Sequence, residues 1–193
     1  MKTNILDILF QTCTSPVDTL SELTNRKPLG LAVLTAVFTS IVFSLTALPN
    51  PPELVETIFH LDKRSFNFML ALGIFVILYV VLIFIGGVLF HITAKLLHGT
   101  GDYSGIVCGL SFACFPLAFL APLAFLRALL ESSGNTLYFM VSTILFIWTL
   151  LLIIIAISVN YRISFWRAIA AFFIPVGLFV ITPLFIITIY GLL

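Results

Sequence analysis

The chain has 193 residues, of which 61% are hydrophobic and only 9% are charged. Soluble domains carry about 25% charged residues and about 45–50% apolar ones, so the composition excludes a water-soluble globule, and it also excludes disordered and disulfide-rich classes. Nine basic and eight acidic residues leave a net charge of +1, which gives no field that would attract nucleic acid. An integral membrane protein is the class that remains.

The N-terminal segment, residues 1–28, predicts amphipathic helices at the membrane surface. One side of its first predicted helix is apolar and consists of Ile5, Ile8, Leu9 and Phe10. A second helix is predicted to begin at Ser15, as N-cap, with Pro16 in the first helical position, and to carry an ion pair between Glu22 and Arg26. We interpret the segment as an anchor in the headgroup plane, with a dedicated partner-docking surface as the alternative.

Five uncharged stretches are long enough for a helix to cross a bilayer core about 30 Å thick. They are Leu29–Leu48, Phe68–Ala94, Ile106–Leu126, Leu137–Val159 and Ala168–Leu193. All nine basic and eight acidic residues fall outside them, as expected because a charge at the bilayer centre costs at least about 2.5–3.5 kcal/mol. We therefore predict an all-α polytopic membrane protein in which residues 29–193 form one domain with five transmembrane helices.

The first two predicted spans are joined by a loop that begins with three prolines, Pro49, Pro51 and Pro52, which end the first helix. In the following segment, Glu53–Leu61, helical spacing sets Leu54, Val55, Ile58 and Phe59 against polar residues, which predicts a short surface helix. The loops are too short to fold alone, so we expect no further domain.

The distribution of Lys and Arg predicts the orientation. The N-terminal segment and the second and fourth loops carry six of them, and the other side carries three. Positive loops stay in the cytoplasm, so we expect a cytoplasmic N-terminus and a C-terminus outside the cell membrane.

The polar residues form no pattern typical of catalysis or metal binding. His91, Lys95 and His98 share one helix face without a third ligand, and we expect them to reach towards headgroups. The three cysteines form no C-x-x-C pattern, and we interpret Cys13 as an inert thiol rather than a lipidation site. Nucleophile-elbow and phosphate-loop motifs are absent. We therefore expect no enzyme activity, no catalytic residues, no cofactor and no metal.

The third and fifth predicted spans contain prolines, which kink a helix, and the third also contains small residues that allow close helix packing. The third carries Pro116 and Pro122, the fifth carries Pro175 and Pro183, and a face for close helix packing is formed by Gly105, Gly109 and Ala113. Each proline frees a carbonyl one turn earlier. Ordinary packing explains these residues, and a kinked bundle with a crevice for a lipid or small solute is the alternative.

Four short motifs in this order resemble the Yip domain family (Ypt-interacting proteins), in particular its smaller prokaryotic members. They are Ser15-Pro16-Val17-Asp18-Thr19-Leu20, Gly99-Thr100-Gly101-Asp102-Tyr103, Phe115-Pro116 and Trp148-Thr149-Leu150. The resemblance covers almost the whole chain and implies five spans, a cytoplasmic N-terminus and an external C-terminus. It also implies structural roles for the matching positions: Gly101 for a turn, Tyr103 as an interfacial anchor and Pro116 for a kink.

Eukaryotic relatives in this family bind small Rab-type GTPases and act in vesicle budding and fusion. This chain departs from them because it has no Asp-Leu-Tyr-Gly-Pro signature and no long cytoplasmic region before its first span. We therefore do not carry GTPase binding across.

The sequence thus predicts a non-enzymatic multi-pass protein of a bacterial or archaeal cytoplasmic membrane. We expect it to organise lipid or bind membrane partners, or to form a homo-oligomer through the face of Gly105, Gly109 and Ala113. A lipid or small-solute transporter that uses the kinked third and fifth spans is the alternative.

Overall fold

The fold is all-helical in the part of the chain that the structure, a computed structural model, describes: residues 5–47 and 65–192. The predicted surface helix Glu53–Leu61 lies outside these residues. In chain order the elements are α1 (Ile5–Thr14), α2 (Pro16–Arg26), α3 (Leu29–Ala47), α5 (Ser65–Leu96), α6 (Tyr103–Ala113), the 3₁₀ helix η1 (Phe115–Phe119), α7 (Leu120–Leu129), α8 (Glu131–Tyr161) and α9 (Phe165–Leu192).

The N-terminal segment forms the two predicted helices, α1 and α2. Pro16 begins α2 directly after its N-cap Ser15, as predicted, but the Ser15 side chain makes no capping hydrogen bond. The predicted ion pair between Glu22 and Arg26 is confirmed, with 2.8 Å between its oxygen and nitrogen atoms. In α1 the predicted apolar side is divided, because Leu9 is buried against the bundle whereas Phe10 points outwards and is 70% exposed.

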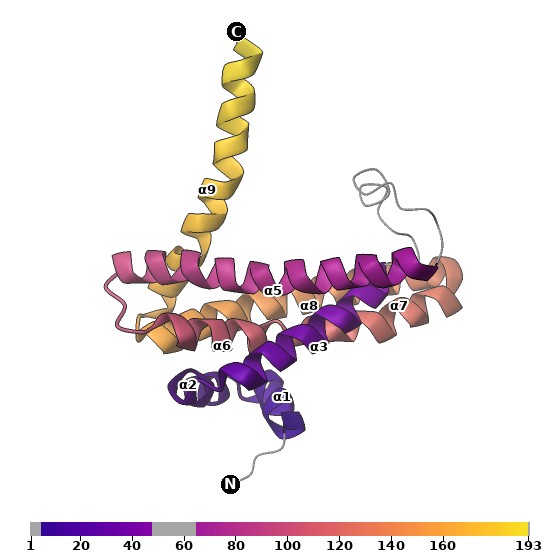
Figure 1. Cartoon of the computed structure of the whole chain (residues 1–193), viewed down its shortest axis with the longest axis horizontal. Helices are drawn as coiled ribbons and strands as arrows, with labels where there is room; N and C mark the ends of the chain where they lie inside the picture. Colours follow the sequence, from indigo (N-terminus) through magenta and orange to yellow (C-terminus); the bar gives the residue numbers. More distant parts are fainter. Residues whose placement is uncertain (1–4, 48–64, 193) are drawn as a thin grey trace.

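Among the residues whose surroundings the structure describes, three helical segments are long and apolar enough to cross a membrane: Leu70–Leu96, Tyr103–Arg127 and Gly134–Tyr161. They correspond to the second, third and fourth predicted spans. Two shorter apolar helices, Leu29–Ser44 and Phe165–Leu178, correspond to parts of the first and fifth. Figure 1 shows α5 and α8 running lengthwise through the bundle, whereas α9 leaves it at a steep angle.

The third predicted span is not one continuous α-helix. α6 ends at Ala113, η1 carries the chain past Pro116, and α7 resumes at Leu120. The physical reason is the missing N–H of proline, which cannot bond the carbonyl of Phe112 one turn earlier. A tighter 3₁₀ turn bridges the gap, in which the Leu117 N–H donates to the Cys114 carbonyl at 3.1 Å.

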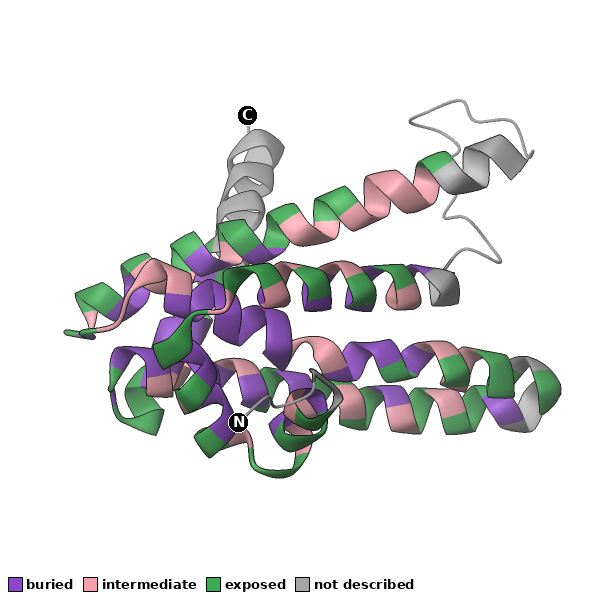
Figure 2. Cartoon of the chain, turned by 60° about the horizontal axis from the view of Figure 1, so that its bottom comes forward, coloured by how far each residue is buried: buried purple, intermediate pink, exposed green. Residues whose placement is uncertain are grey.

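The broken segment lies in the middle of the bundle. α6 packs against α2, α3, α5 and α8, and η1 packs against α3 and α8. The residues of α6 from Gly105 to Ala113 are all buried. Figure 2 shows buried residues where the helices meet and exposed ones along their outer faces. Non-helical backbone at membrane depth is tolerated where protein surrounds it, and η1 has that position.

Candidate functional site: a polar junction at one end of the bundle

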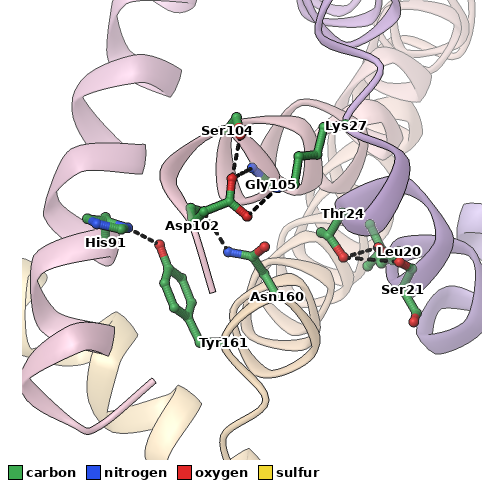
Figure 3. Close-up of polar contacts among 10 residues, drawn as sticks. All are labelled: Leu20, Ser21, Thr24, Lys27, His91, Asp102, Ser104, Gly105, Asn160 and Tyr161. Carbon is green, nitrogen blue, oxygen red and sulfur yellow. Dashed lines mark hydrogen bonds and ion pairs between the residues drawn. The ribbon is translucent and has the colours of Figure 1, made fainter. Parts of the chain in front are cut away.

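Polar side chains from four helices meet where the α5–α6 connection approaches the ends of α2 and α8. We call this cluster the polar junction and define it by Lys27, His91, Asp102, Asn160 and Tyr161 (Figure 3). It brings together residues far apart in the sequence, and Asp102 belongs to the motif Gly99–Tyr103, which runs through it.

Asp102 is the centre of the polar junction. It is the N-cap of α6, and its Oδ2 accepts a hydrogen bond from the Gly105 N–H at 3.2 Å and another from the Ser104 hydroxyl. Such a cap satisfies backbone donors that a helix start leaves unpaired. The negative charge also lies at the positive end of the α6 dipole.

Lys27 connects α2 to Asp102. Its Nζ lies 2.9 Å from the Asp102 Oδ1, and both side chains are partly exposed. Partial burial works to raise the pKa of the Asp102 carboxyl, but hydrogen bonds from Ser104, Lys27 and Gly105, together with the positive charge of Lys27, outweigh it and lower that pKa. The junction therefore holds Asp102 ionised.

The end of α8 is hydrogen-bonded to the α5–α6 connection. The Asn160 side-chain amide donates to the Asp102 carbonyl at 2.9 Å, and the Thr100 N–H donates to the Tyr161 carbonyl at 3.0 Å. Both Asn160 and Tyr161 are buried. These bonds fix the α5–α6 connection on the end of α8.

His91 joins the polar junction from α5. Its Nδ1 lies 2.7 Å from the Tyr161 hydroxyl, and its ring meets Tyr103 edge-on. His98 does not share the predicted face with His91, because α5 ends at Leu96 and His98 adopts a left-handed backbone conformation (φ 64°) beyond it. The predicted set of three is therefore separated.

The glycines of the junction allow close approach of backbones. A Cβ at Gly101 would lie 2.2 Å from the Asn160 carbonyl oxygen, and one at Gly105 would lie 2.1 Å from the Asn160 Oδ1. Gly101 has no positive φ, since no glycine of the described chain has one. Glycine at 101 is thus required for contact with α8 rather than for the turn conformation that we predicted.

The small-residue face of the third span is occupied within the chain. A Cβ at Gly109 would lie 3.0 Å from the Ala156 Cβ, and Ala113 is fully buried. Together with Gly105 against Asn160, this places the face against α8 and α2. A second copy of the chain would find it already covered, and the predicted homo-oligomer through it would need these helices to separate.

The other predicted positions lie in separate places. Tyr103 is half-buried, and its hydroxyl donates to the Phe84 carbonyl on α5 at 3.2 Å; its role as an interfacial anchor stays a prediction. Pro116 is buried in η1, and Pro16 starts α2. Gly101 and Tyr103 are therefore brought together at the junction, whereas Pro16 and Pro116 are not.

Sequence reasoning missed Lys27, Asn160 and Tyr161 as members of the junction. The only available signal was a polar Asn160 at the end of an apolar span, two residues before Arg162. The contacts of the junction are structural: the Asp102 carboxylate pairs with the Lys27 ammonium, and the Asn160 side-chain amide donates to the Asp102 backbone carbonyl. No group of three or more His, Cys, Asp or Glu side chains that could share a metal ion occurs among the residues described.

Comparison with known proteins extends the resemblance seen in the motifs. Neither the curated proteins nor the solved structures gave a match. The sequence does match the family model of the Yip1 domain over residues 10–187, essentially the whole chain. The match includes α2, the polar junction and the broken third span, and the chain therefore belongs to the Yip1 domain family.

Proposed function

We propose that this Yip1 domain protein is a non-enzymatic protein of the cytoplasmic membrane that crosses it five times and organises lipid or binds membrane partners. The observation that carries the proposal is a family match over residues 10–187 in a chain with three apolar helices of membrane-spanning length. The remaining two spans would be α3, with 19 residues, and α9, with 28. At 1.5 Å per residue these helices are about 28 and about 42 Å long.

α9, which would form the fifth span, leaves the bundle at a steep angle (Figure 1). To cross the same bilayer as α5 and α8, α9 would have to bend towards them. Pro175 lies within α9 and removes one hydrogen bond of the helix, which provides a place for such a bend.

The arrangement of α1 and α2 supports a role at the membrane surface. α2 is packed on α6 and α8 and fastened by the ion pair between Lys27 and Asp102. Phe10 of α1 and Val17 of α2 remain exposed. Helices held at the end of a bundle with apolar side chains outwards are suited to lie in the headgroup region.

Two measurements test this proposal. Reporter fusions after residue 28 and after residue 193 should place the first in the cytoplasm and the second outside. Cross-linking of the full chain in native membranes should then return discrete partners or self-complexes. Both fusions on one side would overturn the five-span topology, and recovery of random neighbours alone would overturn the partner role.

One observation favours the alternative of a lipid or small-solute transporter. On α3 and α8, the helices that pack against η1, the hydroxyls of Thr39 and Thr149 are buried without a hydrogen-bond partner. Burying a hydroxyl without a hydrogen-bond partner costs free energy. Such hydroxyls would be able to bond a polar group of a transported lipid or solute. Flux through liposomes that contain the protein, altered by Pro116→Ala, would support transport; no flux with any lipid or solute tested would leave the surface role as the proposal.

A further inference from the structure

The polar junction has a basic edge that its own hydrogen bonds do not use. Lys95 lies in the last turn of α5, His98 follows that helix, Arg162 is the C-cap of α8, and Arg167 lies in the first turn of α9. We call these four residues the basic corner. The α5–α6 connection and the end of α8 are held together by the bond from Thr100 to Tyr161, and α5 is tied to α9 by the bond from the Thr93 hydroxyl to the Ala171 carbonyl at 2.8 Å.

The basic corner is not neutralised by acidic side chains of the described chain. The ion pairs of the described residues are those of Arg26 with Glu22 and of Lys27 with Asp102, and neither includes a residue of the corner. Asp102, the acidic residue of the α5–α6 connection, is thus paired with Lys27, and the sequence contains no Asp or Glu after Glu131. All four side chains of the corner are exposed.

The backbone conformation at this end of the bundle also sets its basic residues apart. The non-glycine residues with positive φ in the described chain are Lys27, His98 and Arg162, at 51°, 64° and 54°. All three carry basic side chains. Glycine is the residue that favours the left-handed conformation at helix ends. The chain therefore carries side chains that can be positively charged where glycine would be less strained.

Exposed aromatic and apolar residues adjoin the basic corner. Trp166 is 79% exposed, and Phe165 and Leu96 are exposed as well. Tryptophan beside basic residues is typical of the boundary between hydrocarbon and headgroups. Basic side chains near that boundary attract anionic lipids.

We infer that the basic corner binds the headgroups of anionic phospholipids, with Trp166 at the edge of the hydrocarbon. The inference rests on the proposed membrane role and names the lipid class that this end of the molecule selects. A favourable interaction of Arg162 with the dipole of α8 would also explain a cation there. That effect does not need an anionic lipid, so the two explanations are separable.

The test measures which lipid lies next to Trp166. The full chain with Trp148→Phe, which leaves Trp166 as the sole tryptophan, is reconstituted in vesicles of phosphatidylcholine and phosphatidylglycerol, and either lipid carries bromine as a quencher. We expect brominated phosphatidylglycerol to quench Trp166 more strongly at equal mole fraction. The triple variant Lys95→Gln, Arg162→Gly and Arg167→Gln should lose this preference, by up to about fivefold in relative affinity per charge removed.

Control variants separate an effect on folding from an effect of charge on lipid preference. Arg162→Gly alone should leave thermal stability unchanged or higher, because glycine relieves the left-handed strain. Arg127→Gln removes an exposed cation of α7 that is bonded to Asn135, and it should leave the preference at Trp166 intact. High salt should weaken the preference of the parent protein.

Equal quenching by the two lipids would overturn the inference, as would a preference that survives the triple variant. Either result in vesicles where the protein is shown to be inserted would leave the proposed membrane role standing. A protein that does not insert would overturn both.

Discussion

α5 and the segment from α6 to α7 are both apolar and long enough to span a membrane, yet they differ in surroundings and in regularity. In the most apolar part of the Leu70–Leu96 span 11% of the residues are buried, against 67% in the Tyr103–Arg127 span. α5 is one unbroken helix of 32 residues, whereas the other segment contains η1. The difference teaches that the regular helix lies outside, where lipid offers its backbone no partners, and that the broken one is surrounded by protein.

The largest difference between the two segments should appear when a large side chain is removed. Phe112 of α6 is fully buried, whereas Leu82 of α5 is 64% exposed. We expect Phe112→Ala to lower the free energy of unfolding by about 2–4 kcal/mol through the cavity that it leaves, since lipid already keeps the ring from water in the unfolded state. Leu82→Ala should change it by less than about 0.5 kcal/mol. Chemical unfolding in detergent micelles measures both, and equal losses would contradict the assignment of inside and outside.

Glycine-to-alanine substitutions should show the same difference between the buried α6 and the exposed α5. Gly105→Ala places a Cβ against Asn160, and we expect a loss of about 1–3 kcal/mol from overpacking. Gly73 on α5 has nothing within 4 Å of such a Cβ. Gly73→Ala should therefore raise stability by up to about 1 kcal/mol through helix propensity. Thermal denaturation of the two variants decides the point, and tolerance of alanine at 105 would show that Asn160 is not fixed there.

Two threonines of α3, a helix that packs against η1, provide a finer comparison. The Thr35 hydroxyl donates to the Leu31 carbonyl at 2.9 Å, whereas the buried Thr39 hydroxyl has no partner. We expect Thr39→Val to stabilise by about 1 kcal/mol, because it removes an unpaired polar group. Thr35→Val should be neutral or slightly destabilising. A destabilising Thr39→Val, measured by the same unfolding assay, would mean that Thr39 binds a ligand or water.

The smallest effect concerns the charge at Asp102. A carboxyl with a folded-state pKa lowered by its partners stabilises the protein above its unfolded pKa of about 3.9. That stability is lost as pH falls through the folded pKa. Asp102→Asn keeps a capping side chain, so we expect a loss below about 1 kcal/mol at pH 7 at this partly exposed pair. Melting temperatures of the variant should depend less on pH below 5 than those of the parent protein.

The sequence predicted the apolar segments because the composition of a membrane helix is set by the lipid around it, and α5 and α8 illustrate this. It could not predict that α6 ends at Ala113, since proline in a membrane helix can cause either a bend or a break. It also could not predict the polar junction. The contact between Gly101 and Asn160 depends on how two distant helix ends meet, and neither residue carries that information locally.

The most direct test of this account is to label the protein from within the lipid. A photoreactive, membrane-soluble reagent applied to the reconstituted full chain, followed by mass spectrometry, records which residues face hydrocarbon. We expect labelling of the exposed residues of α5, such as Ile77, Leu82 and Ile85, and none at Val107 or Phe112 of α6. Labelling of α6 as strong as that of α5 would contradict a buried, broken helix at the centre of the bundle.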